Sequence, residues 1–285
     1  MRLFYTSTSW PKPVSMSKLS KKISKRLKLL ITNHFPHTFF DYLESRFNPY
    51  PPTLSTSAQS GYSIVIITGG EDLPMLRSVL ESIDQELSGQ RAEIILIAPP
   101  NFQLDYSLQI PIRIIAYRDL PFLMPLITRK KNLGVRLAIY DKVVVMHDYL
   151  IFQAGWHDAW QRYGDQFDLA VNCIKDQDDS RFRDWLVLDY PGVGAGFLPY
   201  HAEATAYQYI SGTYFVVKRD FYLANPLDDY RRWGEAEDIE WSKRIRAKTT
   251  FKFNDQAVVR CAKFKGPMLV WADNNLALEK IFNSK

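Results

Sequence analysis

The chain has 285 residues, of which 46% are hydrophobic and 24% are charged, a composition typical of a globular protein that buries one large core or two small ones. No run reaches the roughly 18 to 20 consecutive apolar residues that a membrane-spanning helix requires, so a transmembrane protein is not expected. The two cysteines, Cys173 and Cys261, are far apart in sequence. This spacing argues against a disulfide framework or a metal-ligand pair and favours a reducing, cytoplasmic compartment.

The net charge of +5 is concentrated in the first 30 residues. This segment holds eight of the 36 basic residues and no acidic residue, which leaves 28 basic residues against 31 acidic ones in the rest of the chain. The folded part is therefore mildly acidic and lacks the diffuse positive surface that binds nucleic acid. No nucleic-acid partner is expected.

Residues 16–31 are predicted to form a basic amphipathic helix, because apolar residues recur there at spacings of three and four. These residues are Met16, Leu19, Ile23, Leu27 and Leu30. One interpretation is peripheral contact with an anionic membrane, where each basic residue near the surface contributes about 1 kcal/mol. The alternatives are a helix packed on the main domain and an acid-poor, Ser-rich targeting sequence.

A stretch rich in proline and serine, NPYPPTLSTSAQSG, separates this segment from the rest of the chain. Such a composition is typical of a linker. We therefore predict that residues 1–60 comprise the N-terminal helix and a linker, and that residues 61–285 form the main domain.

The main domain begins with alternating strands and helices. Strands are predicted at 63–68, 92–98, 112–116 and 143–146, with helices at 74–87 and in the first half of 128–150. This alternation indicates an α/β domain with a mostly parallel sheet flanked by helices. Asp148 follows the last of these strands, and in open α/β sheets ligands bind at the carboxyl ends of the strands.

Two common nucleotide-binding motifs are absent. No G-x-G-x-x-G follows the first strand and no G-x-x-x-x-G-K-[ST] occurs anywhere, which excludes a dinucleotide fingerprint and a P-loop. The glycines of PGVGAGF, which are Gly192, Gly194 and Gly196, precede no helix that could bind a phosphate. We predict a mobile loop there that could act as a lid over the site.

Five motifs follow one another in the first half of the main domain. They are the strand and turn SIVIITGGED, the helix LPMLRSVLESI, the strand AEIILIA, the Lys131-Asn132-x-Gly134 motif and the strand that ends in an acidic turn. Together they resemble the nucleotide-sugar-binding half of GT-A glycosyltransferases of the family-two type. This resemblance covers residues 62–150. A second patch at 209–246 resembles the acceptor half of the same enzymes, and we predict that the acceptor half comprises residues 151–285. It implies a Rossmann-like GT-A fold and a nucleotide-sugar donor.

The turn after the last strand departs from the family. It is usually Asp-x-Asp, whose carboxylates hold Mg²⁺ or Mn²⁺ against the diphosphate of the donor. Here the turn reads His147-Asp148-Tyr149. The resemblance implies that Asp148 binds the metal, with His147 as a second ligand that suits Mn²⁺. The alternative is that Asp148 is a cap and His147 a packed histidine.

Four more residues are implied in donor binding. Thr68 and Glu71 would contact the base and ribose, and Lys131 would approach the diphosphate, with Asn132 beside it. Glu71 as a plain surface acid and Lys131 as a solvated helix residue are the alternatives.

The second patch supplies the implied catalytic residues. Its Trp233-Gly234 followed by Glu237-Asp238 is similar to the Glu-Asp motif of inverting GT-A enzymes. The resemblance makes Asp238 the base that takes the proton from the attacking hydroxyl, and Glu237 a neighbour that binds acceptor hydroxyls. Alternatively, these acids only complement the dipole of a helix N-terminus.

Further acceptor contacts are expected from residues that could meet a sugar. They are Gly212, Trp233 and the exposed charged and aromatic segment that contains Arg183, Asp184 and Trp185. Arginine pairs with phosphate and tryptophan stacks on sugar faces, although a salt-bridged loop would fit the same segment equally well.

The resemblance therefore implies an inverting, metal-dependent transferase. It would move a sugar from a UDP- or GDP-sugar to a hydroxyl of a glycan or glycoconjugate in polysaccharide biosynthesis. Two alternatives remain. One is a non-catalytic nucleotide-sugar- or glycan-binding protein, and the other is a sugar nucleotidyltransferase, whose basic glycine-rich loop is replaced here by the acidic TGGEDLPMLR.

Overall fold

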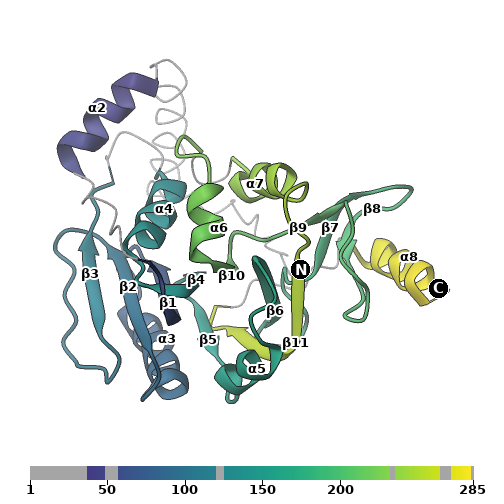
Figure 1. Ribbon diagram of the computed structural model, residues 1–285, viewed down its shortest axis with the longest axis horizontal. Helices are drawn as coiled ribbons and strands as arrows, with labels where there is room; N and C mark the ends of the chain where they lie inside the picture. Colours follow the sequence, from purple (N-terminus) through teal and green to yellow (C-terminus); the bar gives the residue numbers. More distant parts are fainter. Residues whose placement is uncertain (1–36, 49–56, 120–124, 232–234, 264–270, 284–285) are drawn as a thin grey trace, which may run out of the picture.

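The computed structural model describes residues 37–48, 57–119, 125–231, 235–263 and 271–283 (Figure 1). The basic helix predicted at 16–31 lies outside these residues and stays a prediction. Within the described ranges, no helix combines the length and the apolar character that crossing a membrane would require.

A mixed sheet of eight strands forms the centre of the molecule (Figure 1). The order across it is β3-β2-β1-β4-β10-β6-β11-β5. The bounds are Gln59–Ile67 for β1, Ala92–Ala98 for β2, Ile112–Ala116 for β3, Tyr140–His147 for β4, Leu150–Phe152 for β5, Leu169–Lys175 for β6, Tyr214–Lys218 for β10 and Lys252–Cys261 for β11. The predicted α/β architecture is confirmed, and its first four predicted strands correspond to β1 to β4.

The strand directions bring one set of strand ends together. β1 runs parallel to β2 and β4, and β10 runs antiparallel to both β4 and β6. Because β11 is parallel to β6, the carboxyl ends of β1, β4, β6 and β11 all lie at one edge of the sheet. Side chains that follow these strands can therefore meet there, together with residues that precede β10.

Helices cover both faces of the sheet (Figure 1). Side chains alternate along β1, so Ile64 and Ile66 join one buried cluster and Val65 joins the other. The first cluster packs under α3 and α5, and the second under α4, α6 and α7. These helices span Leu73–Leu87 (α3), Ile127–Leu137 (α4), Trp156–Tyr163 (α5), Arg219–Ala224 (α6) and Glu237–Ile245 (α7).

Gly134 allows α4 to lie directly on β1. A β-carbon at Gly134 would stand 2.2 Å from Cγ1 of Val65, a distance that real side chains do not reach. Gly134→Ala adds about 1 kcal/mol of helix propensity, but overpacking a filled core costs about 1 to 3 kcal/mol or more. We expect a net loss in the free energy of unfolding, measured by urea denaturation, and a smaller loss when Val65 is already alanine. Stabilisation by Gly134→Ala alone would contradict this packing.

The glycine-rich segment PGVGAGF is not the loop that the sequence analysis predicted, because Gly194–Phe197 form a strand; its mobility and its role as a lid stay predictions. It forms the turn and second strand of a hairpin in a smaller sheet of order β8-β7-β9, which extends to one side in Figure 1. A β-carbon at Gly196 would stand 2.7 Å from Cδ1 of Leu278, and the amide of Phe197 donates to Asn275 Oδ1 at 2.7 Å. The C-terminal helix therefore braces the hairpin. The bounds are Leu186–Tyr190 for β7, Gly194–Phe197 for β8, Gln208–Tyr209 for β9 and Ala272–Asn283 for α8.

A helix that the sequence analysis did not predict, α2 (His37–Phe47), lies against the main domain. Asp41 on α2 forms an ion pair with Arg129 of α4 and accepts a hydrogen bond from the Tyr230 hydroxyl at 2.7 Å. The predicted division at residues 60 and 61 stays a prediction, because 49–56 lie outside the described residues.

Candidate active site

Thr68 and Asp148 meet where β1 and β4 end. Ile67 pairs with His147 across the two parallel strands, so the residues that follow each strand are neighbours. The Thr68 hydroxyl donates to Asp148 Oδ2 at 2.7 Å and accepts a hydrogen bond from the Gly70 amide at 3.0 Å. Thr68, predicted to contact the nucleoside, thus orients the predicted metal ligand.

The surroundings of Asp148 affect its ionisation in opposite directions. Burial raises the pKa of this carboxyl, while the hydrogen bond from Thr68 and the positive charge of Lys263 act against that rise. The Ala262 amide donates to the Tyr149 carbonyl at 2.7 Å, which ties the backbone before Lys263 to the acidic turn. A partly desolvated carboxylate in this setting is suited to binding a cation or a cationic group.

The donor set at this turn fits a divalent cation that also binds substrate. Within the described ranges, no group of three or more His, Cys, Asp or Glu side chains could hold a metal ion. Mg²⁺ is commonly bound by only one or two carboxylates, with phosphate oxygens and water as the other ligands. Asp148 can serve as such a carboxylate, and His147, whose ring lies 5.4 Å from that of Tyr149, is the adjacent nitrogen donor.

Asp238 is held in a fixed orientation at the start of α7. Its Oδ2 accepts a hydrogen bond from the Gly212 amide at 2.9 Å, and its Oδ1 accepts one from the Ile239 amide, also at 2.9 Å. The residue before the helix, Ala236, has a left-handed backbone with φ of 54°. The Asp238 carboxylate is half-buried and accepts hydrogen bonds on both oxygens.

Lys131 lies beneath these acids and not in solvent. Its side chain is 1% exposed, and its ammonium donates to the Gly212 carbonyl at 2.9 Å and to Glu237 Oε1 at 3.4 Å. The alternative that Lys131 is a solvated helix residue is therefore wrong. The contacts of its ammonium are with the acceptor half, so a direct contact with the diphosphate is not proposed.

The two acidic motifs are connected through the segment that leads into β10. The His147 amide donates to the Thr213 carbonyl at 3.2 Å, and the preceding residue, Gly212, is the residue that holds Asp238. His147, the residue before Asp148, and Asp238 itself are thus each hydrogen-bonded to the two-residue segment that leads into β10. The sequence motifs that contain them are about ninety positions apart in the chain.

Arg183 is brought to the same region. It is exposed, has a left-handed backbone with φ of 44°, and its charge acts on both Tyr149 and Tyr209. Burial raises the pKa of Tyr149 to about 12, with Arg183 and Thr213 opposing the rise. Tyr209, whose pKa burial also raises, is influenced by Asp238 as well. A left-handed backbone at a non-glycine residue costs about 1 to 3 kcal/mol, and such residues cluster at functional sites.

Three predicted site residues are buried and contact other residues of the protein interior. Asp184 is fully buried and accepts a hydrogen bond from the Tyr200 hydroxyl at 2.8 Å. Trp185 is 2% exposed and its Nε1 donates to the Ala202 carbonyl at 3.1 Å. The expectation that the segment is exposed is therefore wrong for both residues. Asn132 is 1% exposed and bonds internally to the backbone of Leu227 and to the side chains of Asp229 and Tyr222.

The remaining predicted residues have different outcomes. Glu71 is exposed on the turn after β1, at the same edge of the sheet, and its contact with a nucleoside stays a prediction. Trp233 lies outside the described residues. Lys263 was missed because the strand that precedes it, β11 (KFNDQAVVRC), has a mixed polar pattern from which the sequence analysis did not predict a strand. Had that strand been predicted, the basic residue that follows its carboxyl end would have been a candidate for the site.

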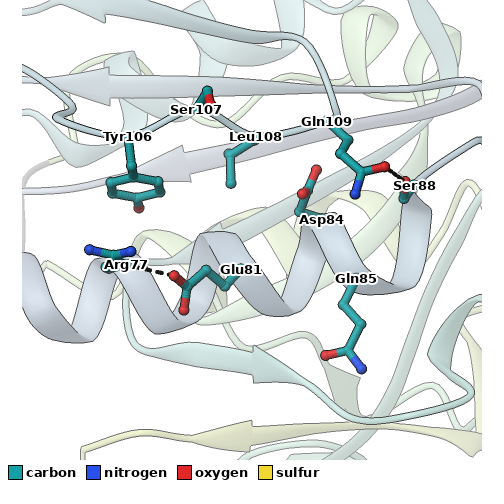
Figure 2. Close-up of a pocket in the computed structure, with 9 residues that line it drawn as sticks. All are labelled: Arg77, Glu81, Asp84, Gln85, Ser88, Tyr106, Ser107, Leu108 and Gln109. Atoms are coloured by element: carbon teal, nitrogen blue, oxygen red, sulfur yellow. Dashed lines mark hydrogen bonds and ion pairs between the residues drawn. The ribbon is translucent and has the colours of Figure 1, made fainter.

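Away from this site, a cleft of about 460 Å³ lies along α3 (Figure 2). Figure 2 shows Arg77 beside Glu81, to which it is paired at 2.8 Å, and under the ring of Tyr106 at 4.7 Å. The cleft contains none of the predicted site residues. These contacts hold the connection between β2 and β3 against the helix.

Comparisons with known proteins find similar solved structures but no similar sequences. No protein-family model matches the chain, and no curated protein sequence matches it. The solved structure of S. aureus TarS residues 1–349 in complex with UDP-GlcNAc superposes with a TM-score of 0.52 and 10% identity, over 74% of this chain and 60% of that one. GalNAc-T7 with UDP, GalNAc and Mn²⁺ superposes with a TM-score of 0.53 and 12% identity, over 79% of this chain and 48% of that one.

Similarity at this level of identity concerns the fold. The chain spans 60% of the TarS chain and 48% of the GalNAc-T7 chain, so each neighbour contains a substantial part with no counterpart in the superposition. The mostly parallel sheet with helices on both faces agrees with the architecture expected from the sequence. The chain therefore has the GT-A fold of the glycosyltransferases to which it is structurally similar.

Proposed function

We propose that this protein transfers a sugar from a nucleoside-diphosphate sugar to a hydroxyl of a glycan or glycoconjugate acceptor, with inversion at the anomeric carbon. The observation that carries the proposal is that His147, the residue before Asp148, and Asp238 are hydrogen-bonded to two consecutive residues, Thr213 and Gly212, at one edge of the sheet. Transfer requires the acid that binds the donor and the base that activates the acceptor to share one reaction centre. This closeness of the two motifs supports the proposal, and a placement on opposite sides of the molecule would have contradicted it.

The donor side would be organised by the turn after β4. Asp148, oriented by Thr68, and His147 would hold a divalent cation, which supplies positive charge to the diphosphate as it departs. Glu71, on the neighbouring turn, would contact the base or ribose. The TarS and GalNAc-T7 structures contain UDP-GlcNAc and UDP respectively, which supports a uridine nucleotide as the first donor to test.

The acceptor side would be organised by α7 and the segment before β10. A sugar hydroxyl is a poor nucleophile at neutral pH, so a positioned carboxylate must accept its proton as the new bond forms. Asp238 would take that proton while the hydroxyl oxygen attacks the anomeric carbon opposite the diphosphate. Arg183 and Glu237 would bind acceptor groups around it, and the hydrogen bonds from Gly212 and Ile239 keep the base oriented.

Calorimetry with UDP and GDP, each with and without Mn²⁺, tests the donor half of the proposal. We expect one nucleotide to bind in preference to the other and to bind more tightly with Mn²⁺. Mixing the preferred UDP- or GDP-sugar with a glycan library then tests transfer. Nucleotide binding without transfer would favour the non-catalytic binding protein, and binding of neither nucleotide would overturn the proposal.

A further inference from the structure

Lys131 is a buried lysine whose ammonium contacts the acceptor half and not the predicted donor-binding residues. It projects from α4 into the space between Gly212 and the first turn of α7, where its side chain is 1% exposed. Desolvation disfavours a buried ammonium and lowers its pKa, and the nearby charges of Glu237 and Asp238 oppose that effect. A methionine of similar size would avoid this desolvation, whereas the Lys131 ammonium is held in place by the Gly212 carbonyl and Glu237.

Gly212 leaves the room in which these groups converge. A β-carbon there would stand 2.9 Å from Lys131 Nζ, 3.2 Å from Glu237 Oε1 and 3.3 Å from the Asp238 β-carbon. Gly212 also connects two of them through its backbone, because its carbonyl accepts from Lys131 and its amide donates to Asp238. Lys131 therefore holds Gly212 in place, and Gly212 in turn orients Asp238, the predicted base.

We propose that Lys131 is a positioning residue for Asp238: it anchors Gly212 and neutralises Glu237, so that Asp238 is presented to the acceptor hydroxyl as an oriented carboxylate. This inference rests on the proposed function. Glu237 and Asp238 are adjacent, and two carboxylates in one site disfavour each other's ionised form unless a positive charge balances them. Lys131 provides that charge without contacting the substrate.

The test is Lys131→Met, which keeps the volume and removes the charge. With wild-type transfer established, we expect kcat to fall about 10- to 100-fold, less than the roughly 10²- to 10⁴-fold contribution of a general base itself. The KM for the donor should stay unchanged, and the acid limb of the pH–rate profile should move to higher pH. Retention of the wild-type kcat and pH profile in this variant would overturn the role of Lys131.

Lys130→Met is the matched control. Lys130 is the neighbouring residue on α4, its side chain is 9% exposed, and its ammonium pairs with Asp119, not with α7. The same loss of charge there should lower stability but leave kcat and the acid limb unchanged. Equal loss of kcat in both variants would assign the effect to damage of α4 and overturn the proposal.

A second variant covers the case in which Lys131→Met does not fold. Lys131→Ala leaves a cavity in which propylamine can restore an ammonium, and we expect the added amine to recover part of the lost kcat. No recovery, with the variant folded by circular dichroism, would overturn the proposal. Absence of transfer by the wild-type protein would instead overturn the proposed function, and the inference would fall with it.

Discussion

Asp238→Asn should lower the transfer rate about 10²- to 10⁴-fold while leaving nucleotide binding intact. The amide has almost the same size as the carboxylate but cannot accept the proton of the attacking hydroxyl. It also replaces one acceptor oxygen with a donor nitrogen, so the hydrogen bond from either Gly212 or Ile239 is lost. The measurement is kcat with a saturating donor, alongside calorimetry with the nucleotide that the wild-type protein binds.

The control for this variant is Glu240→Gln on the same turn of α7. Glu240 is paired with Arg244 at 2.9 Å, so the change removes a carboxylate from the helix N-terminus without touching Gly212 or Asp238. It should lower the rate less than twofold, because Glu240 can affect the reaction only through its interaction with the helix dipole. Full activity of Asp238→Asn would remove the base assignment, and equal losses in both variants would point to the helix and not to proton transfer.

The first half of the fold could be predicted because its strands are buried on both faces. Continuous apolar runs such as SIVIIT and AEIILIA predict interior parallel strands, and they became β1 and β2 within a few residues of the expected bounds. β11 could not be predicted in this way. It alternates irregularly and carries a register shift between Asn254 and Val258, which breaks the periodic pattern that sequence analysis depends on.

The site could be predicted in its acids but not in what holds them. Asp148 and Asp238 follow recognisable motifs, whereas the position of Lys131 depends on contacts with Gly212 and Glu237, which are 81 and 106 residues away in the chain. A lysine on an amphipathic helix is normally solvated, so only the tertiary structure reveals its burial. Trp185 illustrates the opposite error, because an aromatic residue among charged neighbours suggested exposure although its ring stacks on Phe253 in the core.

Replacing Asp148 should weaken nucleotide binding, whereas replacing Asp238 should lower the transfer rate. Asp148→Asn should remove the increase in nucleotide affinity that Mn²⁺ provides and leave the affinity measured without Mn²⁺ unchanged. Loss of a group that only orients a metal ligand typically costs about 10- to 100-fold in metal affinity, which is the expected effect of Thr68→Val at the hydroxyl that donates to Asp148. Removing the charge of the ligand itself should cost at least as much.

The comparison of three variants separates metal binding from simple capping. Asp141→Asn is the matched control, because Asp141 lies at the opposite end of β4 and pairs with Lys218 at 3.1 Å. It should retain the full Mn²⁺-dependent increment in calorimetry with nucleotide, Thr68→Val should retain part of it and Asp148→Asn none. If Asp148→Asn instead keeps the increment and only loses thermal stability, the carboxylate acts as a cap for the turn after β1. The charge of the departing diphosphate would then have to be balanced by cationic side chains at this edge. Among the described residues, Lys263 and Arg183 are candidates, because Lys263 acts electrostatically on Asp148 and Arg183 on Tyr149.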